Sequence, residues 1–452
     1  MVTFRRPRTN PRDSMLAVWA NGERMGTWSV AGGEHSLQYE DTWLTSPAGR
    51  RLSLSLPFTP GNTPHRGDVV RNYFDNLLPD SDAIRRRVAD KFANGSTDTF
   101  DLLAALGRDC VGAVQLLPLD QLPAGFDHID AMPLDEAAVE RAIDSAVSGA
   151  RVLGQQNDDD FRISIAGAQE KTALLRHDGQ WCRPLGATPT THIFKLPLGL
   201  VGNIRANMHD SVENEWLCAR LMALFGFDVA PCEIARFGTR KVLVVKRFDR
   251  TLESPPGKAP WLARLPQEDF CQASGIPGIR KYESDGGPGV RDVLRILDTG
   301  TRAAADKLTF VRTLLAFWLM GATDGHAKNF SIFLERGGGY RMTPLYDVLS
   351  AWPIIGNGPN QLSPRRARLS MALRGKNTHH HLHEIHTRHW QALALQSGVP
   401  DAFDAMVGLV LQVPLALEEA AAELPAGFPQ GVFNAIRRGM LAQAEKFVAG
   451  LP

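Results

Sequence analysis

The chain has 452 residues, of which 44% are hydrophobic and 22% are charged, and its 50 basic and 49 acidic side chains give a formal net charge of +1. A single core rarely grows beyond about 250–300 residues, so this length predicts two or three domains with the composition of an ordinary globular protein. The balanced charge argues against a protein that coats nucleic acid or membrane with its whole surface, although it leaves local basic patches open.

The five cysteines are scattered and form no CxxC pair, which indicates neither a zinc site nor a disulfide framework and fits a reducing compartment. The N-terminal stretch is basic but lacks the apolar segment of a signal peptide. The most apolar run, at 313–322, is far shorter than the ~20 residues that span a bilayer. We therefore expect a cytoplasmic protein that has no membrane partner.

The first part of the chain predicts a small α+β unit. Residues 16–60 alternate apolar and polar side chains around turn signals, which indicates short antiparallel strands. Residues 68–107 change to helical periodicity. We place this unit at 1–117 and expect the acidic stretch 118–158, which contains several turn-forming residues, to be a linker.

The next part, 159–259, predicts strands joined by an unusual loop. Alternation around Ile163 and Ile165 indicates one strand, and a β-prone run resumes at Thr172. A hairpin needs only two turn residues, whereas this loop spans 166–171 and places small residues beside an amide and two charges. This composition indicates a loop that binds a ligand.

The strand "THIFKLP" follows and carries Lys195. A helix is predicted over about 211–226, with Gly226 as its stop, and it carries Glu213 and Glu215. The buried-type strand "KVLVVKRFDR" then ends in charged residues. From 260 onward the chain is predicted to be mainly helical.

Two loops of this helical part carry groups that suit phosphoryl transfer. Asp324 lies five residues before Asn329, and Asp347 follows eighteen residues after Asn329. A protein kinase needs, in this chain order, a small-residue phosphate loop, a strand lysine, a helix glutamate, a hinge strand, a catalytic Asp with an Asn five residues on, and a further metal-binding Asp. Carboxylate and amide oxygens also suit Mg²⁺.

Each feature has an ordinary structural explanation when it is taken alone. Lys195 could be a surface residue, Asp324 before a glycine could be a turn, and Asp347 could cap a helix. Glu213 and Glu215 could be the solvated first turn of their helix. Their joint occurrence in the order of a kinase favours the enzyme.

The chain departs from the usual kinase pattern, because it has no GxGxxG, no His-Arg before Asp324, and Tyr-Asp-Val around Asp347. In these departures it resembles the HipA-type serine/threonine kinases, which are toxins of type II toxin–antitoxin modules. The resemblance runs nearly end to end. Its motifs here are "LSLSLP", "FDNLLPD", "GRDCVGAV", "DFRISIAGAQEKTALL", "THIFKLP", "LPQEDFCQ", "KYESDGGPG" and "GATDGHAKNFS".

The resemblance implies the roles of individual residues. It makes Asp324 the catalytic base and Asn329 and Asp347 the Mg²⁺ ligands. Glu215 is our choice of partner for Lys195, with Glu213 as the alternative that spacing leaves open. The implied ATP-binding residues are Ala166, Gly167, Ala168, Gln169, Glu170, Lys171, Lys195, Lys246, Arg247, Phe248, His326, Ala327, Lys328, Asn329, Tyr346 and Asp347.

Within this set, Lys246 to Phe248 would be the hinge that holds adenine through backbone groups. Lys246 stands where the family commonly has a Glu, and backbone bonding makes that exchange tolerable. In the family, the serine that matches Ser164 is autophosphorylated, which switches the kinase off. A phosphate of about −1.5 to −2 charge cannot share a cradle with the phosphates of ATP.

The resemblance also implies partners. The family phosphorylates a serine of glutamyl-tRNA synthetase, and related kinases modify other aminoacyl-tRNA synthetases, which causes growth arrest and persistence. It binds a helix-turn-helix antitoxin, HipB, and with it represses the operon. The residues that look closest to the family's operator DNA contacts are Gly375, Lys376, Asn377 and Thr378. A solvated basic face is the plain alternative for this stretch.

The fold class implied is α+β, a protein-kinase-like core with a β-rich lobe at 159–259 and an all-α lobe at 260–452, preceded by the small N-terminal unit. Two other functions stay open: an ATP-dependent kinase of a small molecule or lipid on a phosphatidylinositol-kinase-like fold, and an inactive DNA-bound co-repressor. The complete set of kinase residues argues against the second, and the lack of a basic membrane-facing helix argues against the first. We expect the histidine-rich stretch 379–389 to be a partly exposed helix start rather than a metal site.

Overall fold

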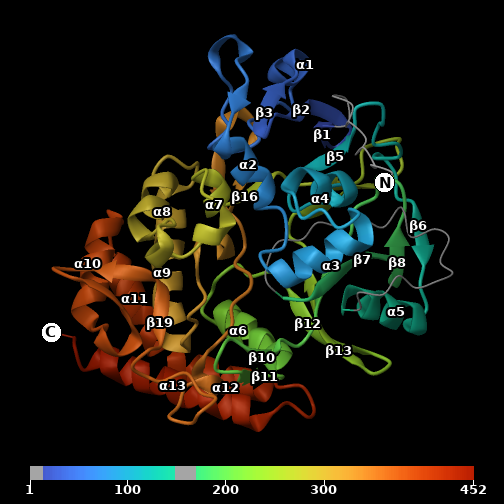
Figure 1. The fold of residues 1–452 in the computed structure, drawn as a ribbon. Coiled ribbons are helices and arrows are strands. Elements are labelled where there is room, and N and C mark those ends of the chain that lie inside the picture. The colour runs from blue at the N-terminus through green and yellow to red at the C-terminus, as the bar shows by residue number, and fades with distance from the viewer. Residues whose placement is uncertain (1–13, 148–168, 452) are drawn as a thin grey trace, which may run out of the picture.

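Figure 1 shows the computed structural model, which describes residues 14–147 and 169–451. The N-terminal unit is built on a five-stranded antiparallel sheet in the order β4-β3-β2-β1-β5, and four helices accompany it. The strands are β1 (Met15–Ala20), β2 (Glu23–Ala31), β3 (Glu34–Tyr39), β4 (His65–Arg66) and β5 (Gln115–Pro118), and the helices are α1 (Asp41–Thr45), α2 (Asp68–Asp75), α3 (Asp82–Phe92) and α4 (Thr99–Leu106).

The core of this unit forms where the helices cover the sheet. Trp28 of β2 is fully buried, and its ring stacks on Phe74 of α2 with 4.0 Å between the ring centroids. Phe100 of α4 packs against the same tryptophan. The expected change from strands to helices is therefore confirmed, although the strands of the first stretch end at Tyr39.

A six-stranded sheet in the order β12-β13-β9-β7-β8-β6 forms the second unit. Phe194 and Lys195 are neighbours in β9, so their side chains lie on opposite faces of the sheet. Phe194 packs with Ile143 of α5, and Lys195 faces α6. The elements of this unit are β6 (Ala131–Pro133), α5 (Glu136–Val147), β7 (Lys171–His177), β8 (Gln180–Pro184), β9 (His192–Lys195), β10 (Gly199–Val201), β11 (Ala206–Met208), α6 (Ser211–Leu224), β12 (Cys232–Phe237) and β13 (Arg240–Lys246).

The expectation of a linker over 118–158 is wrong for 131–147. β6 pairs with β8 at the edge of the second sheet. Val139 and Ile143 of α5 lie four residues apart on one helix face and are buried against the sheet. The acidic residues Glu136, Glu140 and Asp144 of this helix contact residues 238–240 at the turn between β12 and β13, so part of the acidity that suggested a linker belongs to a packed helix.

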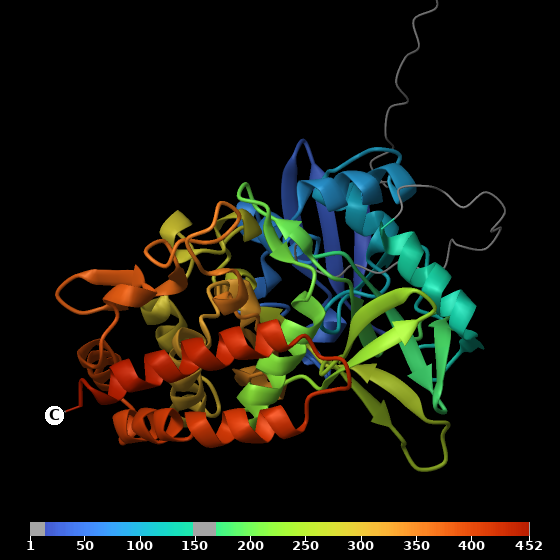
Figure 2. The same cartoon turned by 90° about the horizontal axis from the view of Figure 1, so that it is seen from below.

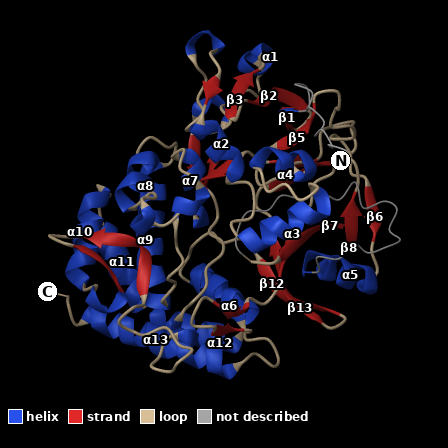
Figure 3. Cartoon of the chain, viewed as in Figure 1, coloured by secondary structure: helices blue, strands red, loops and turns tan. Residues whose placement is uncertain are grey.

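The C-terminal part is mainly helical and gathers on one side of the molecule (Figures 2 and 3). The apolar run at 313–322 belongs to α9, which is buried along most of its length because it is the core helix of this part. The helices are α7 (Phe270–Ala273), α8 (Val290–Leu297), α9 (Ala303–Met320), α10 (Thr387–Ser397), α11 (Ala402–Leu411), α12 (Val413–Ala422) and α13 (Gln430–Val448).

The expectation that this part is all-α is too simple, because short strands also form there. They are β15 (Trp261–Arg264), β16 (Gln267–Asp269), β17 (Ser331–Leu334), β18 (Tyr340–Met342), β19 (Arg368–Arg374) and β20 (Thr378–His381), and β15 pairs with β14 (Arg250–Glu253), which precedes residue 260. β16, β17 and β18 form one small sheet, and β19 pairs with β20.

The basic stretch and the histidine-rich stretch both map to the β19–β20 hairpin and its surroundings. The turn 375–377 is exposed, with the N–H of Gly375 donating to the carbonyl of Asn377 at 2.9 Å. The first histidines lie in β20, and α10 begins only at Thr387, so the expected helix start accounts for the end of the histidine stretch alone. His379 stacks on His389, which joins the strand to the helix.

Among residues 14–147 and 169–451, no single helix is both long and apolar enough to cross a bilayer. Helices α11 and α12 meet the length and composition only when they are taken together, across a bend of 46°.

Candidate active site

A cavity of about 220 Å³ lies where the second sheet, the N-terminal unit and the loops of the helical part meet. Lys195 of β9 and Glu215 of α6 line it on the side of the sheet. Asp324 and Asp347 line it on the side of the helical part, and Asn76 comes from the end of α2. The structure therefore brings together residues that are up to 271 positions apart (76 to 347).

Lys195 is held between two carboxylates. Its Nζ lies 2.5 Å from Oε1 of Glu215 and 2.7 Å from Oδ1 of Asp347, and its side chain is almost fully buried. Burial alone would lower the pKa of Lys195, but Asp347 and Glu215 outweigh it and hold the pKa above the usual value. The lysine is therefore a fixed positive charge at the wall of the cavity.

Glu215, and not Glu213, is the partner of Lys195. Glu213 instead contacts Lys241 of the neighbouring strand β13. The two glutamates are two residues apart, so they point in different directions from α6. Burial raises the pKa of Glu215, and Lys195 opposes that effect.

The loop that carries Asp347 is fixed to α6 as well. The amide of Asn214 donates to the carbonyl of Ser350 at 2.8 Å and accepts from its N–H at 2.9 Å. Asp347 itself has a φ of 61°, a left-handed conformation in which Asp and Asn are enriched among the residues other than glycine. Burial would raise the pKa of Asp347, but Lys195 and Lys171 hold it well below the usual value, so the carboxylate is ionised.

Asn329 and Tyr346 line the cavity next to Asp347. The side-chain amide of Asn329 donates to the carbonyl of Asp347 at 3.3 Å. The hydroxyl of Tyr346 lies 2.8 Å from the carbonyl of Lys328, to which it donates, and 2.5 Å from the hydroxyl of Ser331. Asn329 and Asp347 therefore lie side by side at the cavity.

Asp324 is the most exposed acid of the site, with 62% of its side chain accessible. Its Oδ1 accepts a hydrogen bond from the hydroxyl of Tyr282 at 2.7 Å. Burial and the nearby Asp324 raise the pKa of Tyr282, so this hydroxyl keeps its proton. His326 lies beneath, with its ring against the ring of Tyr282, and burial lowers its pKa.

Lys328 is buried and surrounded by oxygen atoms of the N-terminal unit and of β16. Its Nζ donates to the carbonyl of Asn76 at 2.9 Å and to the side chain of Asn76 at 2.8 Å. Asp269 and Asp80 lie 3.3 and 3.7 Å from the same nitrogen. Burial would lower the pKa of Lys328, but Asp269 and Asp80 raise it above the usual value.

Of the expected phosphate loop, Gln169, Glu170 and Lys171 are described, whereas Ala166, Gly167, Ala168 and the expected modification site Ser164 lie outside the described residues. Glu170 pairs with Arg87 of α3 in the N-terminal unit. Lys171 lies directly opposite Lys195 across the β7–β9 pair. Burial and then Lys195 lower the pKa of Lys171 to about 8.

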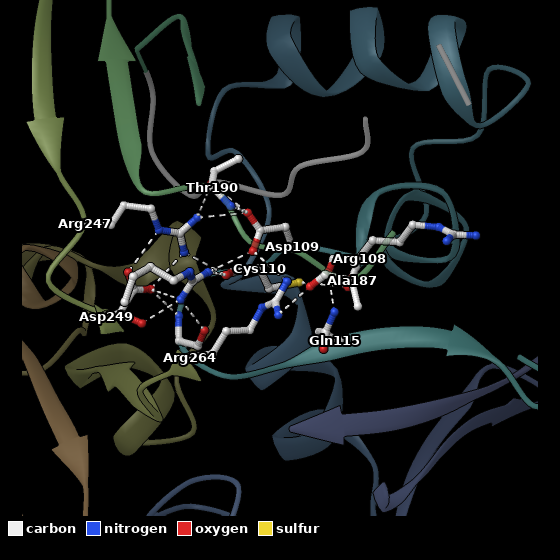
Figure 4. Close-up of polar contacts among 12 residues, drawn as sticks. Arg108, Asp109, Cys110, Gln115, Ala187, Thr190, Arg247, Asp249 and Arg264 are labelled. Carbon is white, nitrogen blue, oxygen red and sulfur yellow. Dashed lines mark hydrogen bonds and ion pairs between the residues drawn. The ribbon is translucent and has the colours of Figure 1, made fainter. Parts of the chain in front are cut away.

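The expected hinge follows β13. The N–H of Lys246 donates to the carbonyl of Pro231 at 2.8 Å, and the N–H of Arg247 donates to the carbonyl of Thr191 at 2.9 Å. In the described part of the chain, the N–H of Phe248 makes no such bond, and Phe248 lines the cavity. The side chain of Lys246 is exposed, whereas that of Arg247 is buried among charged residues (Figure 4).

Sequence reasoning missed several residues of the site. Tyr282 and Lys281 lie within the motif "KYESDGGPG", which signalled the family but not a contact with Asp324. Asn76 and Asp80 lie within "FDNLLPD" in the N-terminal unit, far from the kinase residues in the sequence. No spacing rule connects such distant segments.

A sheet with a lysine, a helix glutamate that holds it, and a helical lobe with an Asp–Asn loop and a second Asp form the two-lobed arrangement of protein kinases. The fold and site define the chain as a kinase, and the α+β fold class predicted from the sequence is confirmed. Comparison with known proteins then identifies which kinase family it is.

Two family models cover most of the chain: the HipA N-terminal domain matches residues 16–117, and the HipA-like C-terminal domain matches 163–417. A Sinorhizobium fredii protein named "Putative kinase Y4mE" is 35% identical over 85% of this chain and 86% of its own. The serine/threonine-protein kinase toxin HipA of Shewanella oneidensis is 28% identical over 70% of each chain. The chain belongs to the HipA family.

The solved structures agree on the fold. A chain of the Shewanella oneidensis complex of HipA, HipB and operator DNA superimposes with a TM-score of 0.77, covering 96% of this chain and 97% of that one at 23% identity.

The choice between the two glutamates can be tested directly. We expect Glu215→Gln to reduce phosphotransfer by about 10- to 100-fold, because a hydrogen bond to a charged group contributes about 1.5–3 kcal/mol. The measurement is the rate of ³²P transfer from ATP at several ATP concentrations. Glu213→Gln is the matched control. It removes the same charge from a position two residues before Glu215, where the partner is Lys241 outside the cavity, and it should retain the wild-type rate. Equal losses in the two variants would contradict the assignment.

Proposed function

We propose that this protein is a serine/threonine-protein kinase that transfers the γ-phosphoryl group of Mg²⁺-ATP to a protein hydroxyl. The observation that carries the proposal is the meeting of Lys195, Glu215 and Asp347 within 2.7 Å in a cavity that also contains Asn329 and Asp324. Phosphoryl transfer needs mainly positioning and compensation of charge, and this cavity offers both.

The two ends of the cavity suit the two parts of ATP, the adenine base and the phosphates. The N–H of Phe248 is the hinge group for adenine, because those of Lys246 and Arg247 are already used within the chain. At the other end, Lys195 and Lys171 would face the phosphates, with Gln169 also lining the cavity. The neutral fraction of Lys171 grows above a pH of about 8, and this weakens attraction for phosphate.

The donor set of Asn329 and Asp347 fits a magnesium ion. Asp347 is ionised, and the amide of Asn329 is oriented by its hydrogen bond to the Asp347 carbonyl. Carboxylate and amide oxygens are the hard ligands that Mg²⁺ prefers. When bound, the ion would neutralise the charge that develops on the phosphate oxygens. Asp347 would then share its carboxylate between the ion and Lys195.

Asp324 is the proposed catalytic base. It is exposed at the mouth of the cavity, where a substrate hydroxyl can reach its carboxylate. The hydroxyl of Tyr282 occupies this acceptor oxygen in the free protein. The carboxylate has a second oxygen and further acceptor sites, so a substrate hydroxyl can bind while Tyr282 orients the base.

The substrate and partners are proposed from the family. We infer an aminoacyl-tRNA synthetase as substrate, with glutamyl-tRNA synthetase as the first candidate, and growth arrest as the outcome. We also infer that the chain binds a HipB-like antitoxin and, with it, operator DNA. The similar Shewanella oneidensis structure, which contains HipA, HipB and operator DNA, supports this inference. The intact kinase residues argue against an inactive co-repressor.

The role of the base gives the first test. We expect Asp324→Asn to reduce phosphotransfer to protein by about 10²–10⁴-fold without unfolding the chain, because the substrate hydroxyl loses its proton acceptor. Asp347→Ala should abolish transfer through loss of the metal ligand. The assay incubates each variant with radiolabelled ATP and cell lysate, and labelled bands are identified by mass spectrometry.

Asp404→Asn, an exposed aspartate of α11, is the matched control and should label the lysate as the wild type does. Wild-type labelling by Asp324→Asn would show that the roles are wrongly assigned. Toxicity on expression should disappear together with activity.

The family resemblance also predicts one phosphate on Ser164 after incubation with Mg²⁺-ATP, and none in Asp324→Asn. Repulsion between this phosphate and those of ATP should weaken nucleotide binding. Intact-mass measurement and peptide mapping locate the phosphate, and a fluorescent ATP analogue reports affinity. A phosphate elsewhere with Ser164 unmodified, or unchanged affinity after modification, would remove this switch.

The antitoxin and DNA are tested together. Co-expression with a neighbouring helix-turn-helix gene should give one peak in size-exclusion chromatography, and separate elution at micromolar concentration would refute the partnership. In the complex, Lys376→Ala at the exposed hairpin turn should weaken operator binding and lower the salt slope by about 1. Arg438→Ala on α13 is the control basic residue and should leave the slope unchanged.

A further inference from the structure

Asp109 lies in the loop between α4 and β5 of the N-terminal unit, yet its side chain contacts residues that follow this unit in the chain, from Thr190 to Arg264 (Figure 4). Its Oδ2 accepts hydrogen bonds from the N–H of Thr190 at 3.0 Å and from the hydroxyl of Thr190 at 2.7 Å. Arg247 lies 3.3 Å from the same oxygen, and Arg250 and Arg264 lie 2.9 and 3.3 Å from Oδ1. Asp109 thus joins four side chains from three separate segments.

This cluster is completely buried and unequally charged. Three arginines face two carboxylates, Asp109 and Asp249, which leaves one excess positive charge. The backbone of the N-terminal unit compensates in part, because the carbonyl of Cys110 accepts from Arg247 at 2.9 Å and from Arg250 at 2.8 Å. Buried charges are tolerated only when they are paired and hydrogen-bonded in this way.

The contacts of Asp109 lie at the point where the two strands of the nucleotide site meet. Thr190 leads into β9, which carries Lys195, and Arg247 leaves β13 for the hinge. These strands are antiparallel neighbours, with Lys246 opposite His192. The carboxylate of Asp109 therefore fixes the beginning of one strand and the end of the other.

The same cluster holds both sides of Phe248. Arg247 precedes Phe248 and Asp249 follows it, and Asp249 accepts from Arg247 at 2.8 Å and from the N–H of Gly112 at 2.8 Å. The backbone at Phe248 is thereby held between two side chains that are anchored in the charged cluster. A shift of the cluster would therefore shift the Phe248 N–H, which is the proposed hinge group.

We propose that Asp109 is a positioning residue for nucleotide binding, through which the N-terminal unit sets the hinge backbone at Phe248 relative to β9. This inference rests on the proposed function, because it takes adenine to bind at the hinge. The N-terminal unit would thereby contribute to binding of the adenine base rather than of the phosphates.

The test compares a ligand that uses the hinge with one that does not. In Asp109→Asn, which keeps the shape but removes the charge, the dissociation constant for ATP should rise about tenfold, which corresponds to about 1.4 kcal/mol. The dissociation constant for inorganic tripolyphosphate, which has no base, should stay unchanged. Calorimetry or displacement of a fluorescent ATP analogue measures both, and kcat at saturating ATP should remain close to that of the wild type.

Two further variants keep the result interpretable if Asp109→Asn folds poorly. Thr190→Val removes the hydroxyl that donates to Asp109 and accepts from Arg247 but keeps every charge of the cluster, and it should raise the dissociation constant for ATP in the same selective way by a smaller factor. Tyr39→Phe removes buried hydrogen bonds inside the N-terminal unit, far from the hinge, and it should lower thermal stability without changing either constant.

A folded Asp109→Asn or Thr190→Val protein with unchanged ATP affinity would overturn the proposal, as would equal weakening of ATP and tripolyphosphate. A wild-type protein that binds tripolyphosphate but not ATP would overturn the hinge role and this inference together. Wild-type binding of ATP without phosphotransfer would instead refute the proposed function alone.

Discussion

Lys195 is the point at which the three parts of the active site are tied together. It belongs to the second sheet, its Glu215 partner belongs to α6, and its Asp347 partner belongs to a loop of the helical part. An isolated buried ammonium group is costly, so the fold is stable only when the carboxylates approach it. The geometry of the site and the packing of the lobes therefore depend on the same contact.

The N-terminal unit is part of this arrangement rather than an attachment to it. It meets the proposed phosphate loop through Arg87 and Glu170, the proposed catalytic loop through Asn76 and Lys328, and the proposed hinge through the Asp109 cluster. All three contacts are polar and involve at least one charged group, and two of them are buried. Polar contacts of this kind fix one relative orientation, because a shifted unit would leave charges without partners.

Much of the site could be predicted from the sequence, because kinase residues occur in short motifs whose spacing is preserved by local structure. The order of Lys195, the helix glutamates, Asp324, Asn329 and Asp347 indicated the enzyme and its fold class. The choice of Glu215 required the orientation of α6 against the sheet, which spacing does not give. Tyr282 could not be placed on Asp324, because that contact joins segments 42 residues apart.

The fold was predicted less evenly than the site. Helices such as α2 and α3 gave periodic signals, whereas β16 and β18 have three residues each, too few for alternation to be seen. The helix α5 was hidden because its buried residues, Val139 and Ile143, are separated by charged and small residues within an acidic stretch.

The unequal charge of the buried cluster has a consequence for how this enzyme can be divided. A fragment without the N-terminal unit would keep every catalytic residue, but Arg247, Arg250 and Arg264 would face Asp249 alone, with two positive charges uncompensated at the hinge. Lys328 would lose Asn76 and Asp80 at the same time. We therefore expect removal of the N-terminal unit to destabilise the rest of the chain, because these buried charges would lose their partners.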